Sequence, residues 1–342
     1  MKKIFRIGTC MLLSGILLVG CGKNSSEVDE KGDSAKSTPP PVEEKIDINI
    51  GSLKGPTTMG MVKLMSDSEE GTTANNYKVS MTGTADEIVA KIVKGEIDVA
   101  AVPCNLASVL YNKTQGGISI AAVNTLGVIY IVENGNQIKS IEDLKGKTIY
   151  STGKGTTPEY VLNYVLAENG IDATKDLTIE YKSESTEVAA ILAEDSNSIA
   201  MLPQPFVTTA QSKNENLRIA LDMTEEWNKV QGENGSALVT GVVIARNEFI
   251  EDNKTAFNYF LDDYKKSTDY VNANVEEAAT LIEKYGIVPA AVAKKAVPLC
   301  NITYVEGIEM KTKVSGYLEV LFNQNPQSVG GKLPADKFYY QK

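Results

Sequence analysis

The chain contains no histidine, and this absence restricts the chemistry that the protein can perform. Histidine is the side chain whose charge changes near neutral pH, and it is also the commonest metal ligand. Serine–histidine and cysteine–histidine nucleophile systems are therefore excluded, as are zinc sites of the ordinary histidine-containing kind. Catalysis by carboxylates or lysines stays open, but the composition favours a protein that is not an enzyme and needs neither cofactor nor metal.

Cysteine is nearly as scarce, with four residues in a chain of 342. Cys10 and Cys21 lie near the N-terminus, so that only Cys104 and Cys300 remain for a folded domain. A disulfide between these two is conceivable in an exported protein. We expect two reduced, buried thiols instead.

Basic residues are fewer than acidic ones: the chain has 34 Lys and Arg residues and 44 Asp and Glu residues, so the formal net charge is −10. Lys2, Lys3 and Arg6 supply three of the positive charges, so the chain without its first 20 residues carries −13. Proteins that bind nucleic acids present basic patches, and we therefore expect no nucleic acid as a partner. One cationic pocket can still occur in an acidic protein, so the net charge does not restrict a buried ligand.

The first 20 residues have the pattern of a secretory signal, with a basic end followed by the apolar run 7–20. That run is shorter than the ~20 residues that a membrane span needs, and we assign 1–20 to a signal peptide. Its end, Leu18-Val19-Gly20-Cys21, resembles the lipobox of bacterial lipoproteins. The resemblance implies cleavage before Cys21, a lipid on its sulfur, and a place on the extracytoplasmic face of a bacterial cell membrane. The alternative is a plain signal peptide with an incidental cysteine.

Residues 21–45 are expected to form a disordered tether. The stretch is rich in charged residues and contains the spacer Pro39-Pro40-Pro41. Such a segment cannot bury enough apolar surface to offset its conformational entropy. No later segment is long and apolar enough to be transmembrane, so a tethered globular part follows.

From residue 46 onward, short β-rich runs alternate with helical runs. Strands are predicted at 46–53, 77–83, 97–103 and 118–125, with helices at 58–67, 84–94 and 105–113. Thr84 and Glu87 have the spacing of a capping box. This alternation is typical of a parallel, doubly wound sheet.

The pattern then restarts. Strands are predicted at 127–135, 147–153, 177–183, 198–205, 217–223 and 237–247, with helices at 157–169, 186–194 and 206–213. Ser140 is expected to cap a short helix with Asp143 three residues later, and Pro158 fits the first turn of its helix. The end reads as helices at 248–274, 275–285, 290–297 and 308–323, without convincing strands. About 300 residues exceed one usual core, so two domains are expected.

Four segments carry a family resemblance: GEIDVAAVP (95–103), KSIEDLKGKTI (139–149), LPQPFVTTA (202–210) and VVIARNEFIEDNKTAFNYFLDDY (242–264). Together they resemble the extracytoplasmic solute-binding proteins of ABC importers. Within these, they are similar to the type II periplasmic-binding fold and its nitrate, sulfonate, taurine and thiamine-precursor branch. The resemblance covers nearly all of residues 46–340.

This resemblance implies an α/β fold of two lobes, each a mostly parallel sheet flanked by helices, with a helical C-terminal region. Lobe I would comprise 46–126 and 242–342, and lobe II 127–241, with crossings near 124–129 and 240–243. The ligand would lie in the cleft at the carboxyl ends of the strands. Closure would bury it and present both lobes of a monomer to a membrane permease.

In lobe I, the loops after the strands are the candidates for ligand contact. Gly55 lets the backbone approach a ligand, and free N–H groups at the following helix start attract negative charge. The alternative is a turn with a threonine cap. Asn105 could equally be a helix cap, and Cys104 a small core residue. The lobe I candidates are Lys54, Gly55, Pro56, Thr57, Thr58, Pro103, Cys104, Asn105, Asn124 and Thr125.

In lobe II, the loop 151–157 is rich in hydroxyls and glycine and suits an oxyanion or another polar group. The alternative is a turn with Lys154 in solvent. Gln204 stands where relatives often carry Glu-Pro, and its neutral amide can donate as well as accept. That difference disfavours a cationic ligand recognised by an acid there. The lobe II candidates are Thr152, Gly153, Lys154, Gly155, Thr156 and Gln204.

Aromatic and methionine side chains are expected to serve packing first. Trp227 and Tyr160 could stack on a ring, but core or surface positions are commoner for such residues. Met59, Met61 and Met65 recur at helical spacing, which favours packing over a binding stripe.

The sequence therefore predicts a lipid-anchored solute-binding component of an ABC importer, for a small organic solute with anions among the candidates. A synthase of the thiamine-precursor branch is disfavoured, because the chain has neither a cysteine-rich run nor a histidine. A surface sensor or adhesin remains the alternative, and an enzyme on the same scaffold is a weaker one. The solute itself (sulfonate, nitrate-like anion, pyrimidine precursor or other) stays open.

Overall fold

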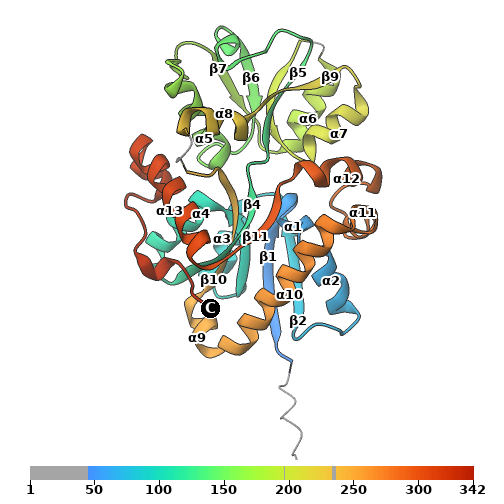
Figure 1. Ribbon diagram of the computed structural model, residues 1–342, viewed down its shortest axis with the longest axis vertical. Helices are drawn as coiled ribbons and strands as arrows, with labels where there is room; N and C mark the ends of the chain where they lie inside the picture. Colours follow the sequence, from blue (N-terminus) through green and yellow to red (C-terminus); the bar gives the residue numbers. More distant parts are fainter. Residues whose placement is uncertain (1–44, 196, 233–235) are drawn as a thin grey trace, which may run out of the picture. The chain divides into compact units, whose positions relative to one another are not determined.

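The computed structural model describes residues 45–195, 197–232 and 236–342 (Figure 1). The signal peptide, Cys21 and the tether as far as Glu44 lie outside the described residues, so what was expected of them stays a prediction. Among the helices of the described ranges, none combines the length and the apolar character required to cross a bilayer.

Two mixed β-sheets organise the described chain (Figure 1). The first has the strand order β11-β4-β10-β3-β1-β2 and the second β7-β6-β8-β5-β9. The strands of the first sheet are β1 (Asp47–Leu53), β2 (Asn76–Thr82), β3 (Val99–Pro103), β4 (Ile118–Leu126), β10 (Val239–Arg246) and β11 (Ile302–Val305). Those of the second are β5 (Ile129–Asn134), β6 (Thr148–Ser151), β7 (Thr178–Tyr181), β8 (Ile199–Pro203) and β9 (Leu217–Asp222).

Each sheet contains a parallel set interrupted by a strand that runs the other way, and the edge strand β11 of the first sheet is also antiparallel to its neighbour β4. In the first sheet, β1 pairs parallel with β2 and β3, whereas β10 is antiparallel to β3 and β4. In the second, β6 pairs parallel with β7 and β8, whereas β5 is antiparallel to β8 and β9. The interrupting strands β5 and β10 are those by which the chain enters a sheet from the other one.

Helices surround both sheets (Figure 1). Those in the first half are α1 (Pro56–Met59), α2 (Val62–Glu69), α3 (Ala85–Val93), α4 (Cys104–Lys113), α5 (Thr157–Glu168) and α6 (Ser185–Glu194). The later ones are α7 (Phe206–Lys213), α8 (Met223–Gln231), α9 (Asn247–Asp252), α10 (Lys254–Ala273), α11 (Val275–Lys284), α12 (Ala290–Ala296) and α13 (Gly307–Gln324). Short 3₁₀ turns occur at Ile141–Leu144, Val297–Leu299, Pro326–Val329 and Asp336–Phe338.

The helix predicted at 58–67 is interrupted in the structure, because the chain breaks between α1 and α2. Ser267 of α10 inserts its hydroxyl into the break, where it donates to the Gly60 carbonyl at 2.8 Å and accepts from the Leu64 N–H at 3.0 Å. A side chain that replaces a helical i to i+4 bond in this way kinks or interrupts the helix.

Several further predictions differ from the structure. The predicted helix 248–274 is divided at Asn253 into α9 and α10, and α8 was not predicted. The C-terminal region does contain a strand, β11, which is only four residues long and pairs irregularly with β4. Thr84 begins α3 without a side-chain cap bond, so its capping box is wrong, whereas that of Ser140 and Asp143 is confirmed.

The passage from β4 to β5 is short and tightly packed. It consists of Gly127 and Val128. Asn301 brackets it, accepting from the Leu126 N–H at 3.1 Å and donating its side-chain amide to the Gly127 carbonyl. A Cβ atom on Gly127 would lie 2.0 Å from Oγ1 of Thr224, so only glycine fits. The second crossing precedes Val239, because residues 240–243 lie inside β10.

The core that positions the site lies under β1 and α10. Phe257, Phe260 and Tyr264 stack along α10, with ring centroids 6.0 and 5.9 Å apart. They pack in one hydrophobic cluster with Ile48 and Ile50 of β1. This packing fixes the Tyr264 ring and turns its hydroxyl toward the end of β4, where Asn124 lies.

Candidate functional site

The carboxyl ends of the parallel strands of both sheets meet at the crossings. Gly241 at the start of β10 pairs with Pro103 at the end of β3 and with Thr125 near the end of β4. Ile129 at the start of β5 pairs with Pro203 at the end of β8. The expected candidates Pro103, Asn124, Thr125 and Gln204 therefore lie at or beside this junction, because the Gln204 backbone N–H bonds the Val128 carbonyl between β4 and β5. Figure 1 shows the passage from β4 to β5.

Several of the buried polar atoms that have no hydrogen-bond partner among the described residues belong to residues at or next to this junction. They are Oδ1 and Nδ2 of Asn124, Oγ1 of Thr125, Oγ1 of Thr240, the hydroxyl of Tyr264, Oγ1 of Thr268 and Nε2 of Gln204. Buried polar groups are nearly always paired, and each orphan costs about 1–3 kcal/mol. We call these six residues the orphan cluster, and such a concentration makes the junction a candidate site for a bound polar group.

Asn124, Tyr264 and Thr268 form the part of the orphan cluster nearest to α10. The Tyr264 hydroxyl lies beside the Asn124 and Thr268 side chains, and burial raises the pKa of this phenol well above its usual range. Tyr264 therefore stays protonated and can donate. Gly60 lines the same place, because a Cβ on it would lie 3.5 Å from Oγ1 of Thr268 and 3.6 Å from the Tyr264 hydroxyl.

The loop after β1 contributes less than its residue types suggest. The hydroxyls of Thr57 and Thr58 both bond the Leu53 carbonyl, at 3.0 and 2.6 Å. Lys54 is exposed, and Pro56 opens a helix of only four residues behind the buried Gly55. The Thr57 methyl does reach the junction, since a Cβ on Gly241 would lie 3.0 Å from it.

Asn105, in α4 beside the first sheet, bonds residues that follow β6 of the second sheet. Its side-chain amide donates to the Ser328 carbonyl at 3.2 Å and to the Gly155 carbonyl at 3.4 Å, and its Oδ1 accepts from Thr157 at 3.4 Å. Asn105 is therefore not the helix cap, a position that Pro103 occupies. Its neighbour Cys104 is a buried free thiol whose pKa is raised by burial, which suits a core residue.

The loop 151–157 uses most of its polar atoms internally. Thr152 bonds Ser185 at 3.2 Å, and Thr156 donates to the Gly153 carbonyl at 2.7 Å. The Gly155 N–H donates to the carboxylate of Glu159, an acid that the sequence analysis did not connect with this loop. Lys154 is exposed, with Nζ 5.9 Å from the centre of the Tyr181 ring.

Gln204 is fully buried, with 0% of its surface exposed. Its backbone N–H donates to the Val128 carbonyl at 3.0 Å, which fixes it to the first crossing. Its Oε1 accepts from the backbone N–H of Thr208 at 3.2 Å and from the Thr208 hydroxyl at 2.8 Å. The nitrogen of the same amide has no partner among the described residues.

The packing expected of the large apolar side chains is confirmed. The Trp227 ring is buried between Tyr164 and Tyr317, with centroids at 4.8 and 5.5 Å, and its Nε1 donates to the Ser236 carbonyl at 2.7 Å. Met59 and Met61 are buried as well. Neither the indole nor this methionine pair is free to stack on a ligand.

Sequence reasoning missed Thr240, Tyr264 and Thr268. Tyr264 and Thr268 lie on α10, more than 130 residues along the chain from Asn124, and no sequence signal connects them. Thr240 lies at the amino end of β10, whereas candidates were sought at the carboxyl ends of strands. A search restricted to the carboxyl ends of predicted strands cannot find ligand-contact candidates at the amino end of a strand or within a helix.

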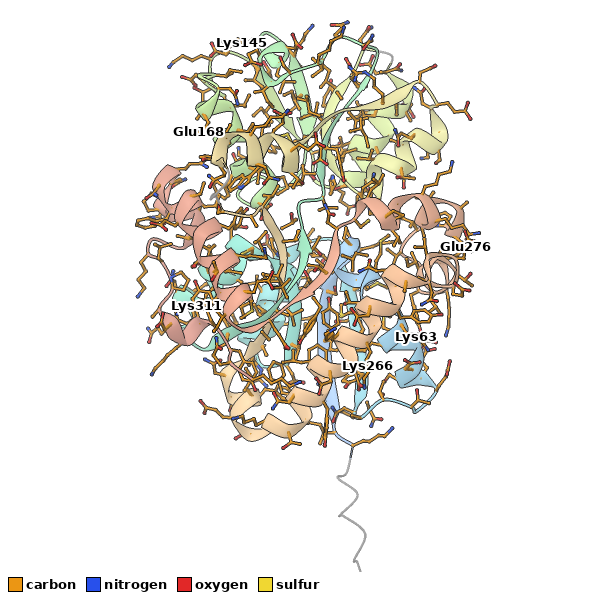
Figure 2. The ribbon with its side chains drawn as sticks, viewed as in Figure 1. Lys63, Lys145, Glu168, Lys266, Glu276 and Lys311 are labelled. Atoms are coloured by element: carbon orange, nitrogen blue, oxygen red, sulfur yellow. The ribbon has the colours of Figure 1, made fainter. Side chains whose placement is uncertain are left out.

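Charged side chains and metal-ligand clusters do not contribute to the orphan cluster, whose members are all neutral. Lys145, Glu168 and Glu276 are exposed and lie at the periphery in Figure 2. Within the described ranges, no group of three or more Cys, Asp or Glu side chains is arranged to hold a metal ion. The junction can therefore bind a polar group through hydrogen bonds from neutral side chains.

Comparison with known proteins gives one family match. The model of a family described as "ABC transporter, phosphonate, periplasmic substrate-binding protein" matches residues 69–294, about two thirds of the chain. No curated protein matches the chain.

Solved structures share the fold. An ABC transporter from Parabacteroides distasonis has 24% identity and a TM-score of 0.71, over 86% of this chain and 99% of that one. The periplasmic aliphatic sulphonate-binding protein SsuA from Escherichia coli has 17% identity and a TM-score of 0.69, over 86% and 92%. The periplasmic nitrate-binding protein NrtA from Synechocystis PCC 6803 has 13% identity and a TM-score of 0.57, over 73% and 69%.

Proposed function

We propose, from the premise that the chain belongs to the family of phosphonate periplasmic substrate-binding proteins of ABC transporters, that it captures a small organic anion between two lobes and delivers it to the permease. Membership makes the chain the substrate-binding component of an ABC importer, with a small molecule and a permease as partners and an extracytoplasmic location. The expected family and the two-lobe α/β fold are thereby confirmed.

The proposed lobes are 46–126 with 242–342, and 127–241. The division of the strands supports these limits, because β1–β4, β10 and β11 form one sheet and β5–β9 the other. Both crossings meet the carboxyl edges of the sheets, which is where open α/β sheets bind ligands. A solute held there would contact both lobes at once.

The orphan cluster is the observation that carries the proposal. Its members come from β4 and α10 of the first lobe, from the start of β10, and from the end of β8 in the second lobe. Amide and hydroxyl groups can all donate, and hydrogen bonds to an ionised acceptor are about twice as strong as neutral ones. An anion can therefore be held at the junction without a lysine or arginine.

Among the sequence candidates, we propose that Asn124, Thr125 and Gln204 contact the solute most closely. Asn105 would join the two lobes around it. The exposed Lys54 and Lys154, with their loops, would lie at the rim. The names of the family and of the sulphonate-binding and nitrate-binding proteins support an anionic solute class, although each name belongs to that family or protein.

Lipid anchoring through Cys21 and a monomeric state are part of the same proposal. The lipobox resemblance supports the anchor, because the tether that follows would let the folded part reach a permease in the same membrane.

Native mass spectrometry of the freshly purified protein tests the function. We expect a fraction of molecules to carry a small solute, which is then released, identified and titrated back while small-angle scattering follows the closure of the lobes. A protein that arrives empty, binds nothing from a broad metabolite panel and does not change its scattering profile would contradict the proposal.

A further inference from the structure

Gln204 is held in one place by both of its neighbouring elements. It lies between the end of β8 and the start of α7, and its backbone N–H bonds the Val128 carbonyl in the crossing segment. None of its surface is exposed. The side chain therefore has a fixed origin at the junction where the two sheets meet.

The orientation of the Gln204 amide is also fixed. Thr208 supplies two donors to Oε1, namely its backbone N–H and its hydroxyl. A flipped amide would place its own N–H₂ group against those two donors, and both bonds would be lost. Thr208 therefore keeps the oxygen of the amide on α7 and directs the nitrogen away from the helix.

The nitrogen directed away from α7 carries two N–H groups and has no partner among the described residues. Only an acceptor can satisfy them. An ammonium group has only hydrogen-bond donors, so it cannot accept a hydrogen bond from Nε2. The rest of the orphan cluster brings no carboxylate that could favour a cation, since its members are neutral side chains.

We propose that Gln204 is the specificity-determining residue of the interlobe site: its fixed amide gives two N–H donors to an unprotonated anionic oxygen of the solute, as in a phosphonate, sulfonate or carboxylate. Thr208 is the positioning residue that sets this orientation. The inference rests on the proposed function. It adds to it the charge of the solute group that contacts the second lobe, which is negative.

The test is thermal melting and calorimetry of the purified full chain with four probes at equal ionic strength: ethylphosphonate, ethanesulfonate, butyrate and n-butylammonium. At least one of the three anions raises the melting temperature of the wild type, and n-butylammonium does not. Gln204→Glu places a carboxylate against the anion, and like charges in contact cost several kcal/mol. The affinity for the bound anion falls at least about 100-fold, the factor for two steps of 1.4 kcal/mol.

A matched control separates local from general charge effects. Gln211→Glu makes the same change on α7, the helix that follows Gln204, where the Gln211 amide donates to the Leu217 carbonyl at 3.2 Å rather than remaining orphaned. It leaves the anion affinity within about twofold. Burial raises the pKa of a carboxyl, so in Gln204→Glu the introduced group regains its proton as the pH falls, and anion binding recovers at acidic pH in this variant alone.

The positioning role of Thr208 is tested separately. Thr208→Val keeps the shape of the side chain but removes the hydroxyl that holds Oε1 of Gln204. We expect the ratio of the affinity for the anion to the affinity for n-butylammonium to fall about threefold. Thr208→Ser restores the hydroxyl and the preference. A purely structural role would lower the melting temperature without changing that preference.

Three results overturn the inference: stabilisation of the wild type by n-butylammonium, equal anion binding by the wild type and Gln204→Glu, or no effect of any anion. If native mass spectrometry then finds a neutral solute in the same protein, capture and delivery of a solute still stand, and only the anionic solute class is overturned. An empty protein that binds no metabolite overturns both.

Discussion

Gly241 is the residue on which the geometry of the site depends most closely. A Cβ at this position would lie 2.6 Å from Oδ1 of Asn124 and 3.2 Å from Cβ of Thr125. Both neighbours belong to the orphan cluster. Any side chain at 241 therefore displaces the groups that we propose to contact the solute.

Gly241→Ala is expected to lower the free energy of unfolding by about 1–3 kcal/mol, because overpacking at a buried position has that cost. It should also weaken solute binding, since Asn124 must move. Urea unfolding and calorimetric titration with the identified solute measure the two effects. Gly83→Ala is the control, because its nearest contact would be an ordinary 3.5 Å to Glu184; equal effects of the two variants would contradict the argument.

At the scale of elements, α10 is the helix that connects the separate parts of the proposed lobe I. Tyr264, Ser267 and Thr268 lie on one face of this helix, as spacings of three and four residues require. Ser267 holds the break between α1 and α2, while Tyr264 and Thr268 face the end of β4. The helix thus supports the loop after β1 and completes the orphan cluster.

Ser267→Ala should destabilise the protein by about 1–3 kcal/mol, because the Gly60 carbonyl and the Leu64 N–H then lose a buried partner. Chemical denaturation measures the change. Ser212→Ala removes an exposed serine from α7 whose hydroxyl bonds only the Thr209 carbonyl, and it should change stability by less than about 0.5 kcal/mol. A Ser267→Ala variant as stable as Ser212→Ala would show that the break does not need the bridge.

The elements also show which parts of the site can be predicted from sequence. Asn124 and Thr125 lie near the end of an apolar strand and Gln204 follows another, so a search of strand ends in the sequence pointed to all three. The helix containing Tyr264 was predicted, but its approach to Asn124 depends on tertiary packing that no local pattern encodes. The strand β11 was missed because four residues at a sheet edge carry too weak a period to recognise.

At the scale of the whole molecule, the proposed capture would use both sheets, and the proposed location depends on a lipid at Cys21. Metabolic labelling with a palmitate analogue in the native host checks the anchor. We expect lipid on the wild type and on Cys10→Ala, whose cysteine lies within the signal peptide, and none on Cys21→Ala. Label on Cys21→Ala would refute lipidation at that residue.

The tight packing of Gly127 against Thr224 has a consequence for how this clamp can change through evolution. The connection between β4 and β5 has room for one of the two side chains but not for both, because an added Cβ at 127 would overlap Oγ1 of Thr224. A descendant that gains a side chain at 127 must therefore lose bulk at 224, and the two positions are expected to vary as a pair. A change of side chain at Gln204 does not involve this contact, so solute preference can change there while the packing of Gly127 against Thr224 stays the same.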